Sequence, residues 1–436
     1  KPEPVVEKDA EGHDVTTMRV LAIDDLDAEV DRVVQELLAW NKGDSPVAIL
    51  EGDVEHGDAS PSWMVFDYRY RHQFPMGPLL PLVPDWAQNG AVKTIMKKAK
   101  TIEGLAAEIG VDPARTYGSW AEMLEREAAL PADQRIEAVS IVTPNHMHAP
   151  PAIAAMEAGF DVIIDKPLAD TLENAQAIAD AAARTGRRIA VTHTYTGYPL
   201  VKQARRLVAS GQFGKVRRVA VKYTQDWLSR PEDLIDNKQA EWRVDPERSG
   251  AAGAFGDIGT HAANLAEFIT GERITSICAE LTMLPGRRID DDGAALFRLS
   301  GGGKGTLTAS QVLVGDINDL AISVYCDEAG LHWRQEEPNT LRVGYRDKPT
   351  EIWHAGANRA YLAGDILAIQ RTPGGHPEGY LEAFANIYAA FGRAIRGVPV
   401  EGDEPGFATM EDTLAGMNFI RASLESSRQG AVWVDL

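Results

Sequence analysis

The sequence predicts an α/β protein in which a parallel-sheet domain is followed by an α/β domain with a large, mainly antiparallel, open sheet. In residues 136–199, three runs rich in Val and Ile alternate with two Ala-rich segments of helical character. Such near-continuous apolar runs separated by helices are typical of parallel strands that are covered on both faces. After residue 200, strand-like runs follow one another with Gly-containing turns at hairpin distance, which is typical of antiparallel strands.

The parallel strands are expected at 138–143, 160–165 and 187–191. Right-handed crossovers place the carboxyl ends of such strands at one edge of the sheet, which is where ligands bind in open α/β sheets. The loops that leave the three strands read Thr-Pro-Asn-His, Asp-Lys-Pro and Thr-His-Thr-Tyr. We therefore expect a ligand site at this edge.

The first hundred residues fit this fold less well. Residues 18–53 read as strand, helix and strand, which resembles the opening of a Rossmann-like domain. The turn after the first strand, however, holds Asp24, Asp25 and Asp27 instead of the G-x-G-x-x-G that lets a backbone approach a pyrophosphate. Residues 63–90 show no period and are expected to be irregular. Helices are expected at 93–110 and 117–129.

The second half of the chain predicts the antiparallel domain. Helices are expected at 201–210, 260–270 and 379–396. Strands are expected at 216–224, 274–284, 294–300, 305–314, 320–326, 331–335 and 341–345.

Composition excludes several classes of function. The 436 residues carry a net charge of −20 without a basic cluster, so nucleic acid is not an expected partner. No run approaches the roughly 18 apolar residues of a membrane span, and the N-terminus resembles a flexible tail instead of a signal peptide. The chain begins with Lys, so a leader could already have been removed. Cys278 and Cys326 are expected to be buried thiols in a reducing compartment, and we expect a cytoplasmic protein.

Lys166 is a candidate catalytic group because it stands at the mouth of a strand, where Pro167 restricts the loop. A lysine there could lower the pKa of a substrate hydroxyl or polarise a carbonyl. A solvated surface lysine is the alternative, since most lysines are exposed.

Asp257 and His261 are four residues apart in a glycine-rich segment, and they would share one face of a helix. A carboxylate that orients an imidazole suits proton transfer, although a helix cap beside a satisfied histidine explains the spacing too. His146 and His148 could be metal ligands, but no cysteine or acid lies nearby, so cofactor or substrate contact is favoured and no metal is expected.

Aromatic and polar clusters later in the chain are candidates for substrate contact. Trp242 with Arg243, and the loop that holds His376, would suit a sugar ring, although core packing or a domain interface explains Trp242 equally well. Residues 290–292, three consecutive aspartates, are expected to form a solvated turn.

Taken together, TPNHMHAP, DKPLA, VTHTYTGYP, EWRVDPERSG and GDIGTH resemble the Gfo/Idh/MocA family of nicotinamide-dependent oxidoreductases, over roughly residues 106–380. The resemblance implies that Lys166, Asp257 and His261 are the catalytic residues. It implies a cofactor, NAD or NADP, that contacts Thr143, Pro144, Asn145, His146, His148, Asp165 and Lys166. The substrate-binding residues expected with it are Tyr195, Tyr198, Trp242, Arg243 and His376.

The resemblance also implies a function. We expect transfer of a hydride from a hydroxyl carbon of a sugar, cyclitol or derivative to the nicotinamide, by a homo-oligomer, either a dimer or a tetramer. Residues 1–195 would bind the dinucleotide, with 1–105 atypical, and residues 196–436 would bind substrate and form subunit contacts. The alternatives are an NAD-dependent glycoside hydrolase of the same family and a non-catalytic sugar-binding relative that has lost the nucleotide site.

Overall fold

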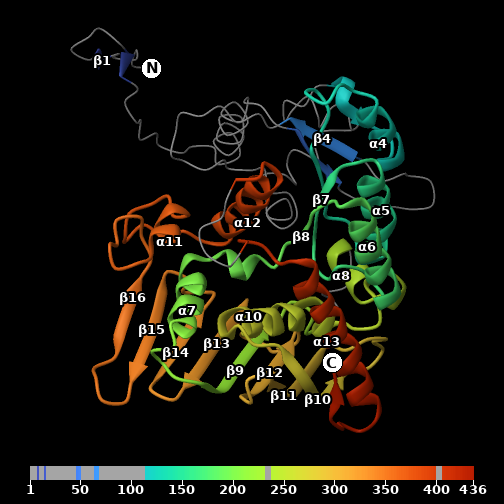
Figure 1. Cartoon of the computed structure of the whole chain (residues 1–436). Coiled ribbons are helices and arrows are strands. Elements are labelled where there is room, and N and C mark those ends of the chain that lie inside the picture. The colour runs from blue at the N-terminus through green and yellow to red at the C-terminus, as the bar shows by residue number, and fades with distance from the viewer. Residues whose placement is uncertain are drawn as a thin grey trace, which may run out of the picture.

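A computed structural model describes residues 113–230, 237–398 and 405–436 of the chain (Figure 1). Upstream of these it describes only the backbone of four short strands, which are β1 (Glu7–Lys8), β2 (Asp14–Val15), β3 (Pro46–Leu50) and β4 (Trp63–Asp67). The predicted helix at 93–110, most of the 18–53 unit and the turn that holds Asp24 lie outside the described residues.

The first sheet has six strands in the order β5-β4-β3-β6-β7-β8. The strands β3, β6 (Ala138–Ile141), β7 (Asp161–Ile164) and β8 (Ile189–Val191) are parallel, as predicted for the last three. The strand β4 is antiparallel to β3, and β5 (Thr116–Tyr117) is antiparallel to β4, so these two strands form one edge of the sheet. All residues of β6, β7 and β8 are buried, which is why their sequences read as continuous apolar runs.

Helices cover both faces of the parallel strands. The helices α4 (Trp120–Ala128), α5 (Ala149–Glu157) and α6 (Leu172–Thr185) share one core with the strands. The other face, formed by Ala138, Ile163 and Ala190, packs against Ile387 and Phe391 of α12 (Tyr380–Ile395), which comes from the far end of the chain. The coverage that the sequence predicts therefore depends on a distant helix.

The second sheet has nine strands in the order β16-β15-β14-β13-β9-β12-β11-β10-β17. Every pair is antiparallel except β9 with β12, which is parallel. The strands are β9 (Val216–Thr224), β10 (Ile274–Thr282), β11 (Asp292–Leu299), β12 (Lys304–Ser310), β13 (Asp319–Cys326), β14 (Ala329–Arg334), β15 (Thr340–Tyr345), β16 (Glu351–His354) and β17 (Val434–Asp435).

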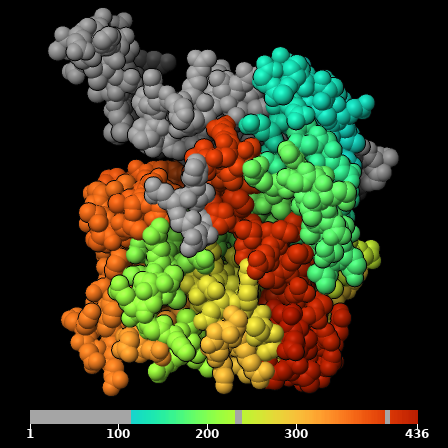
Figure 2. All heavy atoms as spheres, viewed as in Figure 1, coloured from blue at the N-terminus to red at the C-terminus, as the bar shows by residue number. Residues whose placement is uncertain are grey.

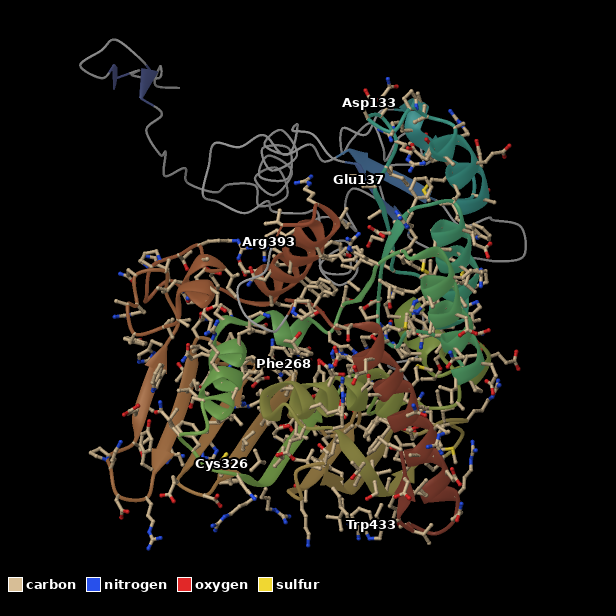
Figure 3. All side chains as sticks on the ribbon, in the orientation of Figure 1. Asp133, Glu137, Phe268, Cys326, Arg393 and Trp433 are labelled. Carbon is tan, nitrogen blue, oxygen red and sulfur yellow. The ribbon has the colours of Figure 1, made fainter. Side chains whose placement is uncertain are left out.

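One face of this sheet is covered by α7 (Pro199–Ala209), α10 (Thr260–Thr270) and α13 (Met410–Arg428), which Figure 1 shows side by side. Buried and exposed residues alternate along β11, so none of the described residues covers its other face. Trp433, whose ring lies under Arg298, is at the end of the sheet that points away from the parallel strands (Figure 3). In Figure 2 the atoms of the C-terminal residues (red) run from the upper centre, past the green residues of the first domain, to the lower right of the molecule.

The fold class predicted from the sequence is confirmed, and β9 and α10 have the predicted bounds. Three expectations were wrong in detail. Residues 63–67 form a strand within the segment expected to be irregular, and the helix expected from 117 begins at Trp120, where the Ser119 side chain caps it. Cys326 is buried, but Cys278 is only half-buried, and neither forms a disulfide.

Candidate active site

The loop after β6 is bound to the second half of the chain. Pro144 precedes the short 3-10 helix η2 (Asn145–Met147). The Asn145 side chain donates to the carbonyl of Ser249 at 2.8 Å, and His146 Nδ1 lies 3.2 Å from the carbonyl of Arg248. Both carbonyls belong to the short helix α9 (Pro246–Ser249). Asn145 and His146, which were predicted to contact the cofactor, therefore also link the loop after β6 to the second half of the chain.

His148 lies inside the protein, with 0% of its surface exposed. Its Nε2 is 2.7 Å from the carbonyl of Thr143, and its Nδ1 is 3.0 Å from that of Pro167. Burial lowers the pKa of His148, against the charge of Asp165. Because both ring nitrogens face backbone carbonyls, His148 fixes the loops after β6 and β7 to one another instead of presenting its ring to a ligand.

Lys166 reaches across to the second half of the chain. Its ammonium donates to Asp257 Oδ1 at 2.5 Å and to the carbonyl of Asp257 at 2.8 Å. The preceding Asp165 carboxylate accepts from the Thr192 hydroxyl at 2.6 Å and from the Lys166 amide at 2.9 Å, which holds the loop that carries the lysine. An ammonium has three N–H groups, so the bonds recorded among the described residues leave one for a ligand.

Asp257 accepts hydrogen bonds through both carboxylate oxygens. Oδ1 is bound by Lys166. The other oxygen, Oδ2, accepts from Gln311 Nε2 at 2.8 Å and lies 3.4 Å from Arg243 Nε. Burial by itself raises the pKa of this carboxyl, but the charges of Lys166 and Arg243 outweigh it and hold the pKa well below its usual range. Asp257 is therefore a fixed anion that positions Lys166.

The backbone that carries Asp257 is a π-helix, η5 (Phe255–Gly259), that continues into α10. Its first turn is held by the Asp290 carboxylate, which accepts from the backbone N–H groups of Gly253 at 2.7 Å and Phe255 at 2.8 Å. A Cβ at position 253 would lie 2.0 Å from the Asp290 carbonyl oxygen, so only glycine fits. The expectation of a solvated turn at 290–292 was wrong, because Asp290 and Asp291 are buried.

His261 lies beside this ion pair, in the first turn of α10, and is buried. Its ring packs edge-on against Tyr195 and His193, with centroids 4.8 Å and 5.5 Å apart, and its Nδ1 has no hydrogen-bond partner among the described residues. Burial, and then the positive charge of Lys166, lower the pKa of His261 well below its usual value. The imidazole is therefore neutral at pH 7 and can accept a proton.

His193 was not singled out in the sequence, although it stands in the loop after β8 that was expected to face the ligand. It is 3% exposed, and its Nδ1 has no partner among the described residues. Burial, and then the charge of Lys166, lower the pKa of His193 from 6.5 to about 4. The site therefore holds two neutral imidazoles next to one ammonium.

The low pKa of His193 predicts a loss of stability in acid. The unfolded chain takes up a proton at this histidine near pH 6.5, whereas the folded chain does so only near pH 4, so falling pH favours unfolding. Urea unfolding should show that His193 accounts for a loss of about 2 kcal/mol between about pH 7 and pH 5. The His193→Gln variant should lose that much less than the wild type, while the exposed His354→Gln control should match it. An equal loss in His193→Gln and wild type would contradict this.

The predicted substrate residues do not all reach this cluster. Tyr195 and Tyr198 are buried with parallel rings 6.3 Å apart, and the hydroxyl of Tyr195 is hydrogen-bonded to that of Tyr223. Arg243 reaches Asp257, and its guanidinium lies 4.3 Å from the Trp242 ring. His376 is exposed in the loop before α12, and among the described residues its recorded contacts lie within that loop.

The residues at the sheet edge fit a nicotinamide cofactor. The Thr143 hydroxyl, at the end of β6, is buried and has no hydrogen-bond partner among the described residues. It stands at the carboxyl edge of parallel strands, where dinucleotides bind in this type of sheet. A buried hydroxyl without a partner costs free energy, so it is a group that a ligand would satisfy.

The described residues also bear on membrane contact and metal binding. No helix among them is long and apolar enough to span a membrane. They also contain no group of three or more His, Cys, Asp or Glu side chains that could hold a metal ion.

Comparison with known proteins extends the geometric findings. Residues 75–193 match the model of the oxidoreductase family with an NAD-binding Rossmann fold, and residues 201–332 match that of the GFO/IDH/MocA C-terminal domain. The first match begins upstream of residue 106, where the motifs had suggested that the resemblance starts.

Individual relatives agree. The chain is 30% identical to the uncharacterized oxidoreductase YfiI of Bacillus subtilis over 334 residues, which cover 75% of this chain and 84% of that protein. It is 27% identical to a levoglucosan dehydrogenase of Pseudarthrobacter phenanthrenivorans over 56% of this chain and 67% of that protein. An inositol dehydrogenase homolog from Azotobacter vinelandii, solved with NAD+, superposes with a TM-score of 0.70 at 31% identity, covering 77% of this chain and 86% of that one. The chain therefore belongs to the Gfo/Idh/MocA family of NAD(P)-dependent oxidoreductases.

Proposed function

We propose that the protein oxidises a hydroxyl group of a sugar, cyclitol or derivative, with NAD or NADP as hydride acceptor. The observation that carries this proposal is the contact of Lys166 with Asp257 beside a neutral His261, at the carboxyl edge of the parallel strands. The names of two relatives, a levoglucosan dehydrogenase and an inositol dehydrogenase homolog, support the substrate class.

The three residues would divide the proton chemistry. His261 is neutral, and its Nδ1 has no hydrogen-bond partner among the described residues. It would accept the proton of the substrate hydroxyl as general base. The remaining N–H of Lys166 would donate to the same oxygen and stabilise the negative charge that develops on it. Asp257 would hold Lys166 in place. The nicotinamide, when bound, supplies the hydride-accepting carbon.

Residues 1–195 are proposed to bind the cofactor, and residues 196–436 the substrate. The cofactor would contact the residues of the loops after β6 and β7, namely Thr143, Pro144, Asn145, His146 and Asp165. The Thr143 hydroxyl, which has no hydrogen-bond partner among the described residues, supports this assignment. His148 would not contact the cofactor directly, since backbone carbonyls enclose its ring, but would hold these loops in position. Tyr195 and Arg243 would line the substrate side, because they contact His261 and Asp257.

Two measurements test the function. Titration with NADH and NADPH, followed by nicotinamide fluorescence, should show saturable binding of at least one of them. Absorbance of the reduced cofactor should then rise when NAD+ or NADP+ is mixed with myo-inositol, D-glucose or levoglucosan. Failure to bind either nucleotide would contradict the proposal. Release of p-nitrophenol from a p-nitrophenyl glycoside without net cofactor reduction would show glycoside cleavage instead.

We further propose that the open face of the nine-stranded sheet pairs with a second copy of the chain. Leu296 on β11, Tyr325 on β13 and Ile352 on β16 are exposed large apolar side chains of this sheet, and apolar exposure of this kind marks contact surfaces. Light scattering should give at least twice the mass of one chain, and Leu296→Asp should lower that mass. A wild type that is monomeric at high concentration would refute the pairing.

A further inference from the structure

A hydrogen-bonded row of amide and phenol side chains stands at one end of the second sheet, beside His261. This amide–phenol row consists of Tyr223, Gln225, Asn318, Gln335 and Tyr198. The central three groups come from adjacent strand ends, since Gln225 follows β9, Asn318 precedes β13 and Gln335 follows β14. The order of these strands in the sheet brings residues from three parts of the sequence to one edge.

The row is oriented by its own hydrogen bonds. Asn318 Oδ1 accepts from the Tyr223 hydroxyl at 2.8 Å and from Gln225 Nε2 at 2.7 Å. Asn318 Nδ2 in turn donates to Gln335 Oε1 at 3.2 Å, and Gln335 Nε2 donates to the Tyr198 hydroxyl at 3.4 Å. The Trp227 indole N–H donates to Gln225 Oε1, so Gln225 must donate through Nε2. The orientations of Asn318 and Gln335 follow from this in turn.

The row is continuous with the proposed catalytic groups on two sides. The hydroxyl of Tyr223 is hydrogen-bonded to the hydroxyl of Tyr195, and the ring of Tyr195 packs against His261. On the other side, Thr224 pairs with Ser310 across the parallel strands β9 and β12, so the next residues, Gln225 and Gln311, are neighbours. Gln311 donates to Asp257.

The row keeps hydrogen-bonding capacity for a ligand. By the bonds recorded among the described residues, Asn318 and Gln335 each retain one amide N–H, and Gln225 retains one carbonyl lone pair beside the one that accepts from Trp227. All three amides are half-buried, so they are reachable from outside the core. Uncharged groups that offer both donors and acceptors match hydroxyl groups, which also do both.

The cations at this edge are already paired. Lys166 and Arg243 bind Asp257, Arg334 binds Asp319 and Glu336, and Lys222 binds Asp319. The N–H that Lys166 keeps is assigned to the reacting hydroxyl group. Among the described residues of the row and its immediate partners, no other cation is left for a carboxylate or phosphate elsewhere on the ligand. Moving such an anion out of water without a partner is costly, and the surrounding carboxylates would repel it.

We infer that the amide–phenol row binds the hydroxyl groups of a neutral polyol and excludes sugar acids and sugar phosphates. This inference rests on the proposed function, because it assigns the row to the substrate of that reaction. It narrows the substrate to uncharged sugars and cyclitols.

Binding can be measured without turnover, which separates this inference from the proposed activity. Isothermal titration of the protein, with and without saturating NADH, would compare D-glucose and myo-inositol with D-glucuronate and D-glucose 6-phosphate. At least one neutral polyol should bind at least about tenfold more tightly than either anion. Equal or tighter binding of an anion, or no binding of any neutral polyol, would overturn the inference even if nucleotide binds.

A charge placed in the row should change its selectivity. In Gln335→Lys, the Kd for D-glucuronate relative to D-glucose should fall by about tenfold or more, since the new ammonium supplies the missing partner. Gln212→Lys adds the same charge on an exposed turn and should leave the ratio unchanged. A second variant, Gln335→Met, should weaken neutral polyol binding by about tenfold without strengthening the binding of D-glucuronate. An unchanged ratio in folded Gln335→Lys, or unchanged polyol binding in Gln335→Met, would refute the role of the row.

Discussion

Replacing Lys166 with Met should lower kcat by about 10³-fold, because it removes the N–H donor proposed to face the developing alkoxide. Met is unbranched and only one atom shorter than Lys, and it carries no charge. Asp257 would remain an anion held by Gln311 and Arg243, so the fold should survive. The loss should therefore appear in kcat, while nucleotide binding changes little.

Steady-state kinetics and a fluorescence titration would check this result. Lys304→Met, at the opposite end of β12 from Gln311, is the matched control and should keep wild-type kcat. As pH falls, the residual activity of Lys166→Met should also begin to decrease at a higher pH than the activity of the wild type. The reason is that the Lys166 charge lowers the pKa of His261, so its removal lets the imidazole take up a proton more readily. A kcat within a few-fold of wild type would exclude Lys166 from the chemical step.

Replacing His261 with Gln should lower kcat by about 10²- to 10⁴-fold, the usual contribution of a general base. Gln fills similar space and can bind the substrate hydroxyl, but it cannot accept the proton at neutral pH. The exposed His354→Gln variant is the matched control and should retain activity. Retained activity in His261→Gln would show that another group takes the proton.

The pH profile gives His261 a second test. Because burial and Lys166 depress the pKa of His261, the wild type should keep kcat/KM constant as pH falls through 6.5 and lose activity only at lower pH. The residual rate of His261→Gln should lack that limb and rise with hydroxide concentration. If the variant showed the same decrease in rate at low pH, that decrease would come from another residue. The nearest imidazole is that of His193.

The secondary structure was predictable where burial follows a simple period. In β6 and β7 every residue is buried, so apolar residues dominate these strands. In α10 nearly every residue is buried, and apolar residues recur along the helix between polar ones such as Asn264 and Glu267. The helix α13 was missed because Ser423 and Ser426 occupy fully buried positions. Their hydroxyls bond to backbone groups, including the amide of Ala279 in β10, so the polar residues are satisfied inside the core while the apolar period is interrupted.

The sequence by itself determined the fold class, the family and the three groups of the candidate site. Local signals sufficed, because strand periodicity and the motifs around Lys166, Asp257 and His261 are written in contiguous residues. Only the tertiary structure decided how these groups are held and what surrounds them. Gln311 and Asn318 have no motif of their own; they reach the site because strand order and loop closure bring distant residues together. The same closure encloses His148, which the motif alone had placed beside the cofactor. Burial and neighbouring charge, which set the protonation of His261, exist only after the chain has folded.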